Sequence, residues 1–290
     1  MDTSLLISPK RYSLVAFLLL AFVIAWGFWI SAALASKGLL PFPFPVTLAG
    51  VLGAWGPGLA GTIITAVKDG RDGLRMLFKR LSVWRVGIQW YLFVLLWPAV
   101  LSLLVTALSM LFGSSSPDFA NPPVTYAYPA PPEAFSAGFL PLLPIVFVTQ
   151  VFGSSMGEEI GWRGFALPRL QARQSALLAS GILGVVWGLW HLPRVWTPGD
   201  PFDLASFGWL MMGLVLNSVL YTWVFNNTRG SLLLVLLFHT AQPVTTLFLA
   251  KVSNPLVENV LIALLVILVV TQSGAGHLTR EPTSAAHKIS

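Results

Sequence analysis

Long apolar runs recur along the whole of this chain, and each is long enough to cross a lipid bilayer. A membrane-spanning helix needs about 20 mostly apolar residues, because every backbone polar group must be satisfied within the segment. Such runs follow one another from Ser13 to Thr271. Only 10% of the 290 residues are charged, against about 25% in a soluble domain. The sequence therefore predicts an all-α, polytopic membrane protein.

Prolines, glycines and charged residues divide the apolar sequence into eight predicted spans. These spans begin near Ser13, Val46, Ile88, Ala137, Ser175, Phe207, Ser231 and Pro255, and the last ends near Thr271. The six basic residues from 68 to 85 are expected in the connection after the second span. We expect one membrane-embedded helical domain over residues 1–272, with its core motifs at 157–243, and a polar tail over residues 273–290.

The basic residues gather on one side of the predicted spans. With a cytoplasmic N-terminus, 14 of the 17 Lys and Arg residues fall on the cytoplasmic side, and Lys37, Arg194 and Lys251 fall on the other. Cytoplasmic loops of membrane proteins carry such an excess. We therefore expect both termini in the cytoplasm and the protein in the cell membrane. The net charge of +6 is then explained by topology, and no nucleic-acid partner is expected.

The stretch from Met156 to Gly164 places two carboxylates and an arginine inside the fourth span. A charge near the bilayer centre costs roughly 2.5–3.5 kcal/mol on insertion scales, so such residues need partners or a function. Glu159 and Arg163 are four residues apart, one helical turn along the same face, and are predicted to form an ion pair. Glu158 points about 100° away from that face, which leaves it free for chemistry.

Two histidines are also embedded in apolar sequence, His191 in the fifth span and His239 in the seventh. Glu158 and His191 are equally distant from a predicted turn and helix start at Gln174-Ser175, so a hairpin would bring them to about the same level. A buried carboxylate with two imidazoles can activate a water molecule, with the carboxylate as general base. The same trio of Glu158, His191 and His239 could instead hold a zinc ion with one open position. From the sequence, water activation by the carboxylate alone and by a bound zinc ion are both retained as mechanisms.

Each of these residues also has a purely structural interpretation. The Glu159–Arg163 pair could hold helices together, and Glu158 could be a protonated carboxyl bonded to a backbone carbonyl. His191 could cap a helix end, and His239 could form an interhelical hydrogen bond. A small-residue face, typical of close helix packing, is made by Gly50, Gly53, Gly56, Gly58 and Gly61.

These motifs together resemble the CPBP family, the type II CAAX prenyl endopeptidases and bacteriocin-processing or immunity proteins, also called the Abi family. One motif is Glu158-Glu159-x-x-x-Arg163-Gly164. Another is Trp187, four residues before His191, where the family often has Phe. The third is the stretch from the basic turn at Arg229 to His239. The resemblance covers about residues 157–243, and the first three spans match only as apolar helices.

The resemblance implies an intramembrane endopeptidase with an all-helical fold and a cavity that opens to the cytoplasm. It assigns water activation to Glu158, in the double-glutamate motif with Glu159, and to His191. It assigns oxyanion stabilisation to His239. The implied partners are the lipid bilayer and a peptide or lipidated-protein substrate in the membrane, and a divalent metal such as zinc is the cofactor to test.

One position departs from the family pattern. The family often carries Asn four residues after the last histidine as an oxyanion donor, and this chain has Pro243 there. Gln242 and Asn217 are the candidate replacements, and loss of one such donor can cost 10²–10³ in rate. A non-hydrolytic membrane protein of the immunity kind is therefore the alternative function. A transporter with a Glu–His proton relay is a third, although the chain shows no internal repeat.

Overall fold

The computed structural model describes residues 11–128, 131–135, 137–197 and 203–279, and the regular structure in these ranges is helical throughout. The longer helices are α1 (Arg11–Ser36), α3 (Gly56–Lys79), α4 (Ile88–Leu111), α9 (Ala176–Trp190), α10 (Leu204–Asn227), α11 (Leu232–Phe248) and α12 (Pro255–Ser273). The shorter α-helices are α2 (Val46–Ala54), α5 (Val124–Ala127), α6 (Leu143–Gln150), α7 (Met156–Glu159) and α8 (Leu167–Gln171). Single turns of 3₁₀-helix are η2 (Arg80–Ser82), η3 (Pro132–Phe135), η4 (Leu140–Leu142) and η7 (Leu192–Trp196). The π-helical turns are η5 (Val151–Ser155) and η6 (Ile160–Ala166).

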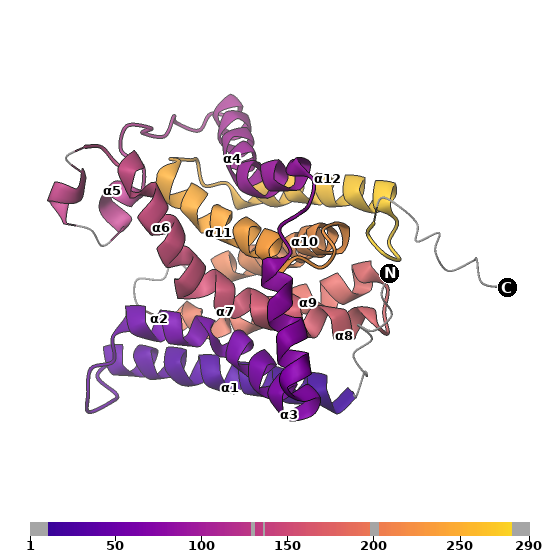
Figure 1. The fold of residues 1–290 in the computed structure, drawn as a ribbon. Coiled ribbons are helices and arrows are strands. Elements are labelled where there is room, and N and C mark those ends of the chain that lie inside the picture. Colours follow the sequence, from indigo (N-terminus) through magenta and orange to yellow (C-terminus); the bar gives the residue numbers. More distant parts are fainter. Residues whose placement is uncertain (1–10, 129–130, 136, 198–202, 280–290) are drawn as a thin grey trace.

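Seven helical segments in the described part of the chain are long and apolar enough to cross a membrane. Each coincides with a predicted span, which confirms an all-α polytopic membrane protein. The predicted seventh span differs, because α11 has only 17 residues and is shorter than a full crossing. The start of α1 and the end of α12 lie at the same end of the molecule (Figure 1).

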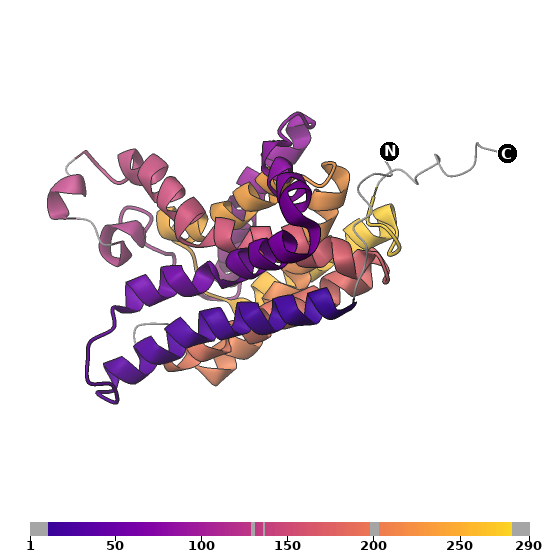
Figure 2. The same cartoon turned by 60° about the horizontal axis from the view of Figure 1, so that its bottom comes forward.

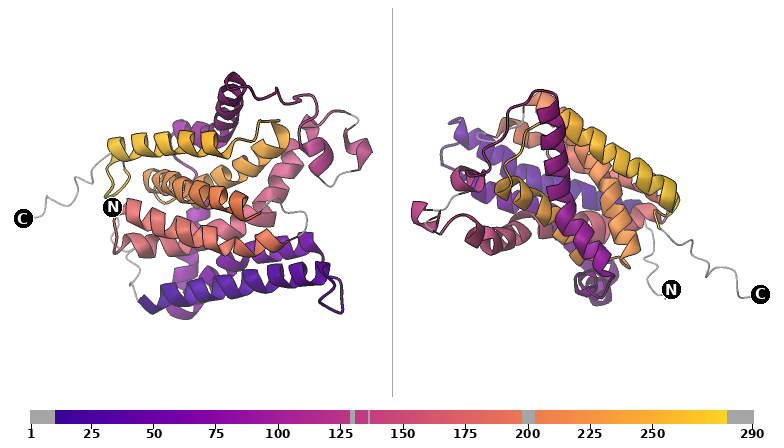
Figure 3. Two further views of the ribbon diagram at one scale, coloured as in Figure 1. Left: turned by 180° about the vertical axis from the view of Figure 1, so that it is seen from behind. Right: turned by 90° about the horizontal axis from the view of Figure 1, so that it is seen from above.

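The long helices lie in layers. Seen from behind, α12, α10, α9 and α1 follow one another from top to bottom (Figure 3), and α10 packs against both α9 and α12. α1 runs along the length of the molecule with α2 beside it (Figure 2). The segment from α6 to α8, which carries the double-glutamate motif, lies between these outer helices (Figure 1).

Glycines let α3 approach the double-glutamate segment closely. A Cβ atom on Gly58 would lie 2.6 Å from the carbonyl oxygen of Gly157, and one on Gly161 would lie 2.4 Å from the backbone of Pro57. No larger side chain fits at such contacts, so backbone packs directly on backbone. The predicted small-residue face therefore packs as expected at Gly58, although a Cβ on Gly50 would meet nothing within 4 Å.

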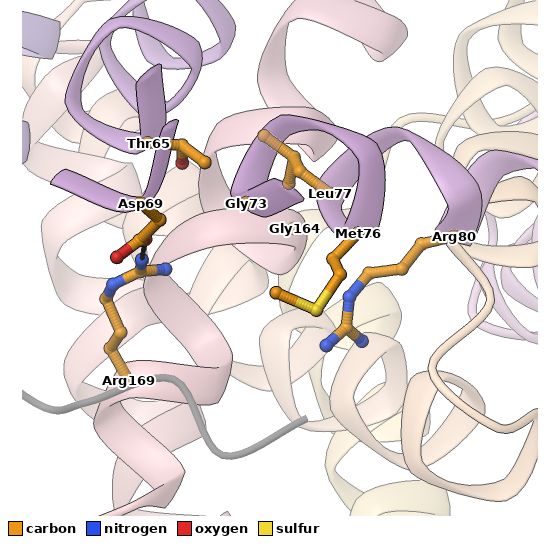
Figure 4. A pocket seen from close by; sticks show the side chains of 8 residues that line it. All are labelled: Thr65, Asp69, Gly73, Met76, Leu77, Arg80, Gly164 and Arg169. Atoms are coloured by element: carbon orange, nitrogen blue, oxygen red, sulfur yellow. Dashed lines mark hydrogen bonds and ion pairs between the residues drawn. The ribbon is translucent and has the colours of Figure 1, made fainter. Parts of the chain in front are cut away.

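The basic stretch after the second span is helical, contrary to our prediction of a connection. α3 continues through it to Lys79, with a break at Gly70, where φ is 62° and ψ is −153°. Glycine adopts this conformation readily because it has no Cβ atom. Asp69, just before the break, forms an ion pair of 3.2 Å with Arg169 of α8 (Figure 4), so this stretch is tied to the segment that carries the two glutamates.

The predicted hairpin between the fourth and fifth spans is confirmed. Ser175 caps the N-terminus of α9, and its hydroxyl accepts a hydrogen bond from the Leu178 backbone N–H. The first residues of the expected polar tail also pack here, because the Ala176 N–H donates to the Gly276 carbonyl at 2.8 Å. Leu278 is fully buried. The tail from residue 280 onward lies outside the described residues.

Candidate active site

The two glutamates lie on α7, a single α-helical turn between the π-turns η5 and η6. π-Turns widen a helix locally and occur often at functional sites. Glu158 and Glu159 are only 3% and 1% exposed. Burial of two ionisable side chains next to each other requires hydrogen-bond partners for both, and the two side chains find different ones.

Glu158 accepts hydrogen bonds from two neutral donors. Ser154 Oγ donates to Oε1 at 2.8 Å, and the indole Nε1 of Trp187 donates to Oε2 at 2.6 Å. No ion pair to Glu158 occurs within the described ranges. Neutral donors therefore orient the carboxylate from both sides.

His191 is joined to Glu158 through the same tryptophan. It caps the C-terminus of α9 and is 8% exposed, and its Nδ1 lies 2.9 Å from the Trp187 carbonyl oxygen. A carbonyl can only accept, so Nδ1 carries the proton and Nε2 of the neutral ring keeps a lone pair. Trp187 thus orients the carboxylate with its side chain and the imidazole with its backbone. Glu158, Trp187 and His191 are called the first unit below.

Glu159 pairs with Arg163, as its spacing predicted, and it also contacts His239. Its Oε1 lies 2.8 Å from Arg163 Nη1 and 2.8 Å from His239 Nδ1. The Arg163 guanidinium lies 4.4 Å from the ring centroids of both Trp187 and Tyr221, at a distance typical of cation–π contact. Glu159, Arg163 and His239 are called the second unit below.

The sequence predicted that Glu158, His191 and His239 meet at one water molecule. In the structure His239 bonds to Glu159 through Nδ1, and this bond leaves its Nε2 unused. The Trp187 ring contacts both histidines, with centroid distances of 6.1 Å to His191 and 5.6 Å to His239. The structure therefore brings all four predicted catalytic side chains around one tryptophan, divided between two units.

The two candidate oxyanion amides are bonded to each other. Gln242 Nε2 donates to Asn217 Oδ1 at 3.0 Å, Tyr221 Oη donates to Gln242 Oε1 at 3.1 Å, and Asn217 Nδ2 donates to the Gly213 carbonyl at 2.9 Å. This chain of bonds ties α10 to α11. Each amide keeps one N–H that these bonds do not use.

A zinc ion at Glu158, His191 and His239 is the alternative that the sequence left open. Both Glu158 oxygens already accept short hydrogen bonds, while His191 and His239 each use Nδ1 for a bond within the protein, and those bonds leave Nε2 of both rings unused. Within the residues that the structure describes, no group of three His, Cys, Asp or Glu side chains is arranged to hold a metal ion. A catalytic zinc site needs three such ligands at about 2 Å from one point.

Two residues of the site were not predicted from the sequence, Ser154 and Tyr221. Ser154 lies four residues before Glu158, so the spacing used for Glu159 and Arg163 could have identified it. Tyr221 is fully buried beside the Arg163 guanidinium. The sequence indicates it only weakly, because it is a single tyrosine inside an apolar span. Its contact joins segments 58 residues apart, which a local pattern does not reveal.

Fold and site together define a polytopic helical membrane protein with a buried carboxylate–imidazole site. Comparisons with known proteins are more specific. Residues 139–245, which contain both units, match the family described as type II CAAX prenyl endopeptidase Rce1-like. The chain is also 27% identical over 253 residues to CAAX prenyl protease 2 of Methanococcus maripaludis, covering 81% of this chain and 84% of that relative. Both findings support the CPBP/CAAX protease family, as the motifs predicted, and an intramembrane endopeptidase. Neither favours the non-hydrolytic alternative.

Proposed function

We propose that this protein hydrolyses a peptide bond near the lipidated C-terminus of a membrane-associated protein. The similarity to CAAX prenyl protease 2 supports this substrate class. The observation that carries the catalytic part is the Trp187 bridge, which holds the Glu158 carboxylate and the His191 imidazole by bonds of 2.6 and 2.9 Å. A positioned carboxylate next to a basic imidazole nitrogen is suited to activating water.

In the proposed reaction, Glu158 takes a proton from a water molecule as the oxygen adds to the carbonyl carbon of the substrate. The Nε2 lone pair of His191 accepts the second water hydrogen bond and orients the nucleophile. The C–N bond then breaks, and the proton held by Glu158 passes to the leaving amine. General base catalysis of this kind typically contributes 10²–10⁴ in rate.

His239 is proposed to stabilise the oxyanion. Its Nδ1 faces the Glu159 carboxylate, which favours a doubly protonated ring whose Nε2–H can donate to the tetrahedral oxygen. Electrostatic donors aimed at the developing charge are a large contribution in acyl transfer. We assign Gln242 and Asn217 to holding α10 and α11 together, because each already spends amide hydrogen bonds within the protein.

The water activation is proposed to be metal-independent. This proposal is supported by two observations: in the described part of the chain no three His, Cys, Asp or Glu side chains are grouped to hold a metal ion, and both Glu158 oxygens already accept hydrogen bonds. The site is further proposed to open to the cytoplasm, since the positive-inside pattern places the start of α11 on that side.

A cleavage assay tests the proposal. The purified protein, reconstituted in liposomes, receives a farnesylated C-terminal CAAX peptide or the same peptide without the lipid. We expect cleavage of the farnesylated peptide and a loss of roughly 100-fold or more in kcat for His191→Ala. His277→Ala, which changes an exposed histidine, is the matched control and should cleave normally.

Equal cleavage by His191→Ala and His277→Ala would contradict the catalytic assignment. Preference for the unlipidated peptide would contradict the substrate class. The assay is repeated after treatment with a strong chelator, and the proposal predicts an unchanged rate. A rate abolished by the chelator and restored by zinc would contradict the metal-independent mechanism.

A further inference from the structure

Three arginines meet at the turn between α10 and α11, away from the site described above. Arg229 lies in this turn, and its Nη2 donates to the backbone carbonyl of Arg85. Arg80 reaches the same turn, because a Cβ atom on Gly230 would come within 2.5 Å of Arg80 Nη1. Ser231 Oγ donates to the Val83 carbonyl at 2.6 Å. The segment between α3 and α4 is therefore fastened to this turn. Arg80 reaches the turn with its side chain, while Arg85 and Arg229 line the same hollow beside it.

No carboxylate in the described ranges pairs with these three guanidinium groups. The nearest acidic residue in the neighbouring pocket, Asp69, is paired with Arg169. Figure 4 shows Arg80 turned away from that pair, on the far side of Met76. Arg80 instead lies over the Phe225 ring, 5.3 Å from its centroid. The turn is thus a concentration of positive charge without an internal counter-ion.

The backbone at Arg229 supports a role for its side chain. Its φ is +58°, a left-handed conformation that glycine adopts freely and arginine does not. An arginine at such a position is worth a functional hypothesis when its side chain is also directed to a specific place. Here it lines an open hollow, together with Ser82, Val83, Trp84 and Arg85.

We propose that this hollow binds the phosphate of an anionic phospholipid headgroup. Guanidinium groups match phosphate geometry with paired hydrogen bonds. Trp84 is 58% exposed beside them, and the Arg85 guanidinium lies 5.1 Å from its ring centroid. An exposed tryptophan next to basic residues is typical of the membrane–water interface. The hollow also lies at the cytoplasmic ends of the long spans, as the distribution of basic residues assigns them.

The test compares the full-length protein in nanodiscs of phosphatidylcholine alone with nanodiscs containing 30% phosphatidylglycerol. We expect phosphatidylglycerol to raise the Tm of the wild type, and Arg85→Gln to remove at least half of that rise. Arg229→Gly is the sharper variant, because it also removes the backbone strain. Because it also removes the bond to the Arg85 carbonyl, its Tm in phosphatidylcholine serves as its own reference, and it should gain less from phosphatidylglycerol than the wild type does.

Arg75→Gln is the matched control, an exposed arginine on α3 outside the hollow, and should keep the full rise. The proposal is overturned if phosphatidylglycerol does not stabilise the wild type, or if Arg75→Gln loses as much of the rise as Arg85→Gln. It is also overturned if inorganic phosphate reproduces the rise in phosphatidylcholine nanodiscs, since the hollow would then bind a soluble anion. Activity is not the readout, so failure here leaves the proposed peptidase function standing.

Discussion

Glu158 and Glu159 are neighbours in the sequence and equally buried, yet they have different surroundings. Glu159 faces a guanidinium and an imidazole, whereas Glu158 accepts only from a hydroxyl and an indole N–H in the described part of the structure. A carboxylate that is ion-paired with a buried arginine holds helices together, while a carboxylate bonded only to neutral donors can still exchange a proton. The difference therefore separates a unit that holds the site from a unit that performs the proposed chemistry.

The largest expected effect on stability is at Glu159. Glu159→Gln leaves the buried Arg163 without its anion, and breaking a buried pair in this way costs about 3–5 kcal/mol. The measurement is the free energy of unfolding of the purified protein. Glu258→Gln is the control, because its pair with Lys251 at 3.2 Å is partly exposed and is worth less than about 1 kcal/mol. If both variants unfold alike, the second unit does not hold the fold.

Sequence spacing predicted the second unit only in part. Glu159 and Arg163 lie on one helix, so a local rule found their ion pair, and the Ser175 cap and hairpin followed from similar local patterns. The bond from His239 to Glu159 joins residues 80 positions apart, and no local periodicity encodes it. The Trp187 bridge likewise depends on how α9 packs against α7. The short α11 was predicted as a full span because its sequence is as apolar as its neighbours.

The next prediction concerns the Trp187 bridge between Glu158 and His191. Trp187→Phe keeps an aromatic ring but removes the N–H that donates to Glu158. A hydrogen bond to a charged group is worth about 1.5–3 kcal/mol, so kcat should fall roughly 10–100-fold with KM little changed. Trp190→Phe is the matched control, since the buried Trp190 Nε1 has no hydrogen-bond partner among the described residues. A fall in kcat as large in Trp190→Phe would mean that ring volume, and not the bridge, matters.

A smaller fall in kcat is expected when Ser154, the other hydrogen-bond donor to Glu158, is changed. Ser154→Ala removes the hydroxyl that donates to Oε1, and because the site is only partly buried there, water can replace part of the bond. We expect kcat to fall roughly 3–10-fold, measured in the same assay. Ser155→Ala provides the comparison, because the Ser155 hydroxyl has no partner in the described structure and its loss should leave kcat unchanged.

The smallest effect on catalysis is expected at Gln242. Gln242→Met breaks its bonds to Tyr221 and Asn217, which should cost about 1 kcal/mol of unfolding free energy. Because we assign this amide to structure, cleavage should change less than about three-fold. A fall of 10²–10³ in kcat with normal stability would instead identify Gln242 as the oxyanion donor that replaces the usual Asn.

The most direct test of the division between the two units is the cleavage rate of Glu158→Gln, measured on samples whose unfolding transition is recorded at the same time. Glutamine keeps the shape of the side chain but cannot take a proton from water. We predict a fall in kcat of roughly 10²–10⁴-fold with a Tm close to that of the wild type. Cleavage within about ten-fold of the wild-type rate by a fully folded Glu158→Gln protein would contradict the account.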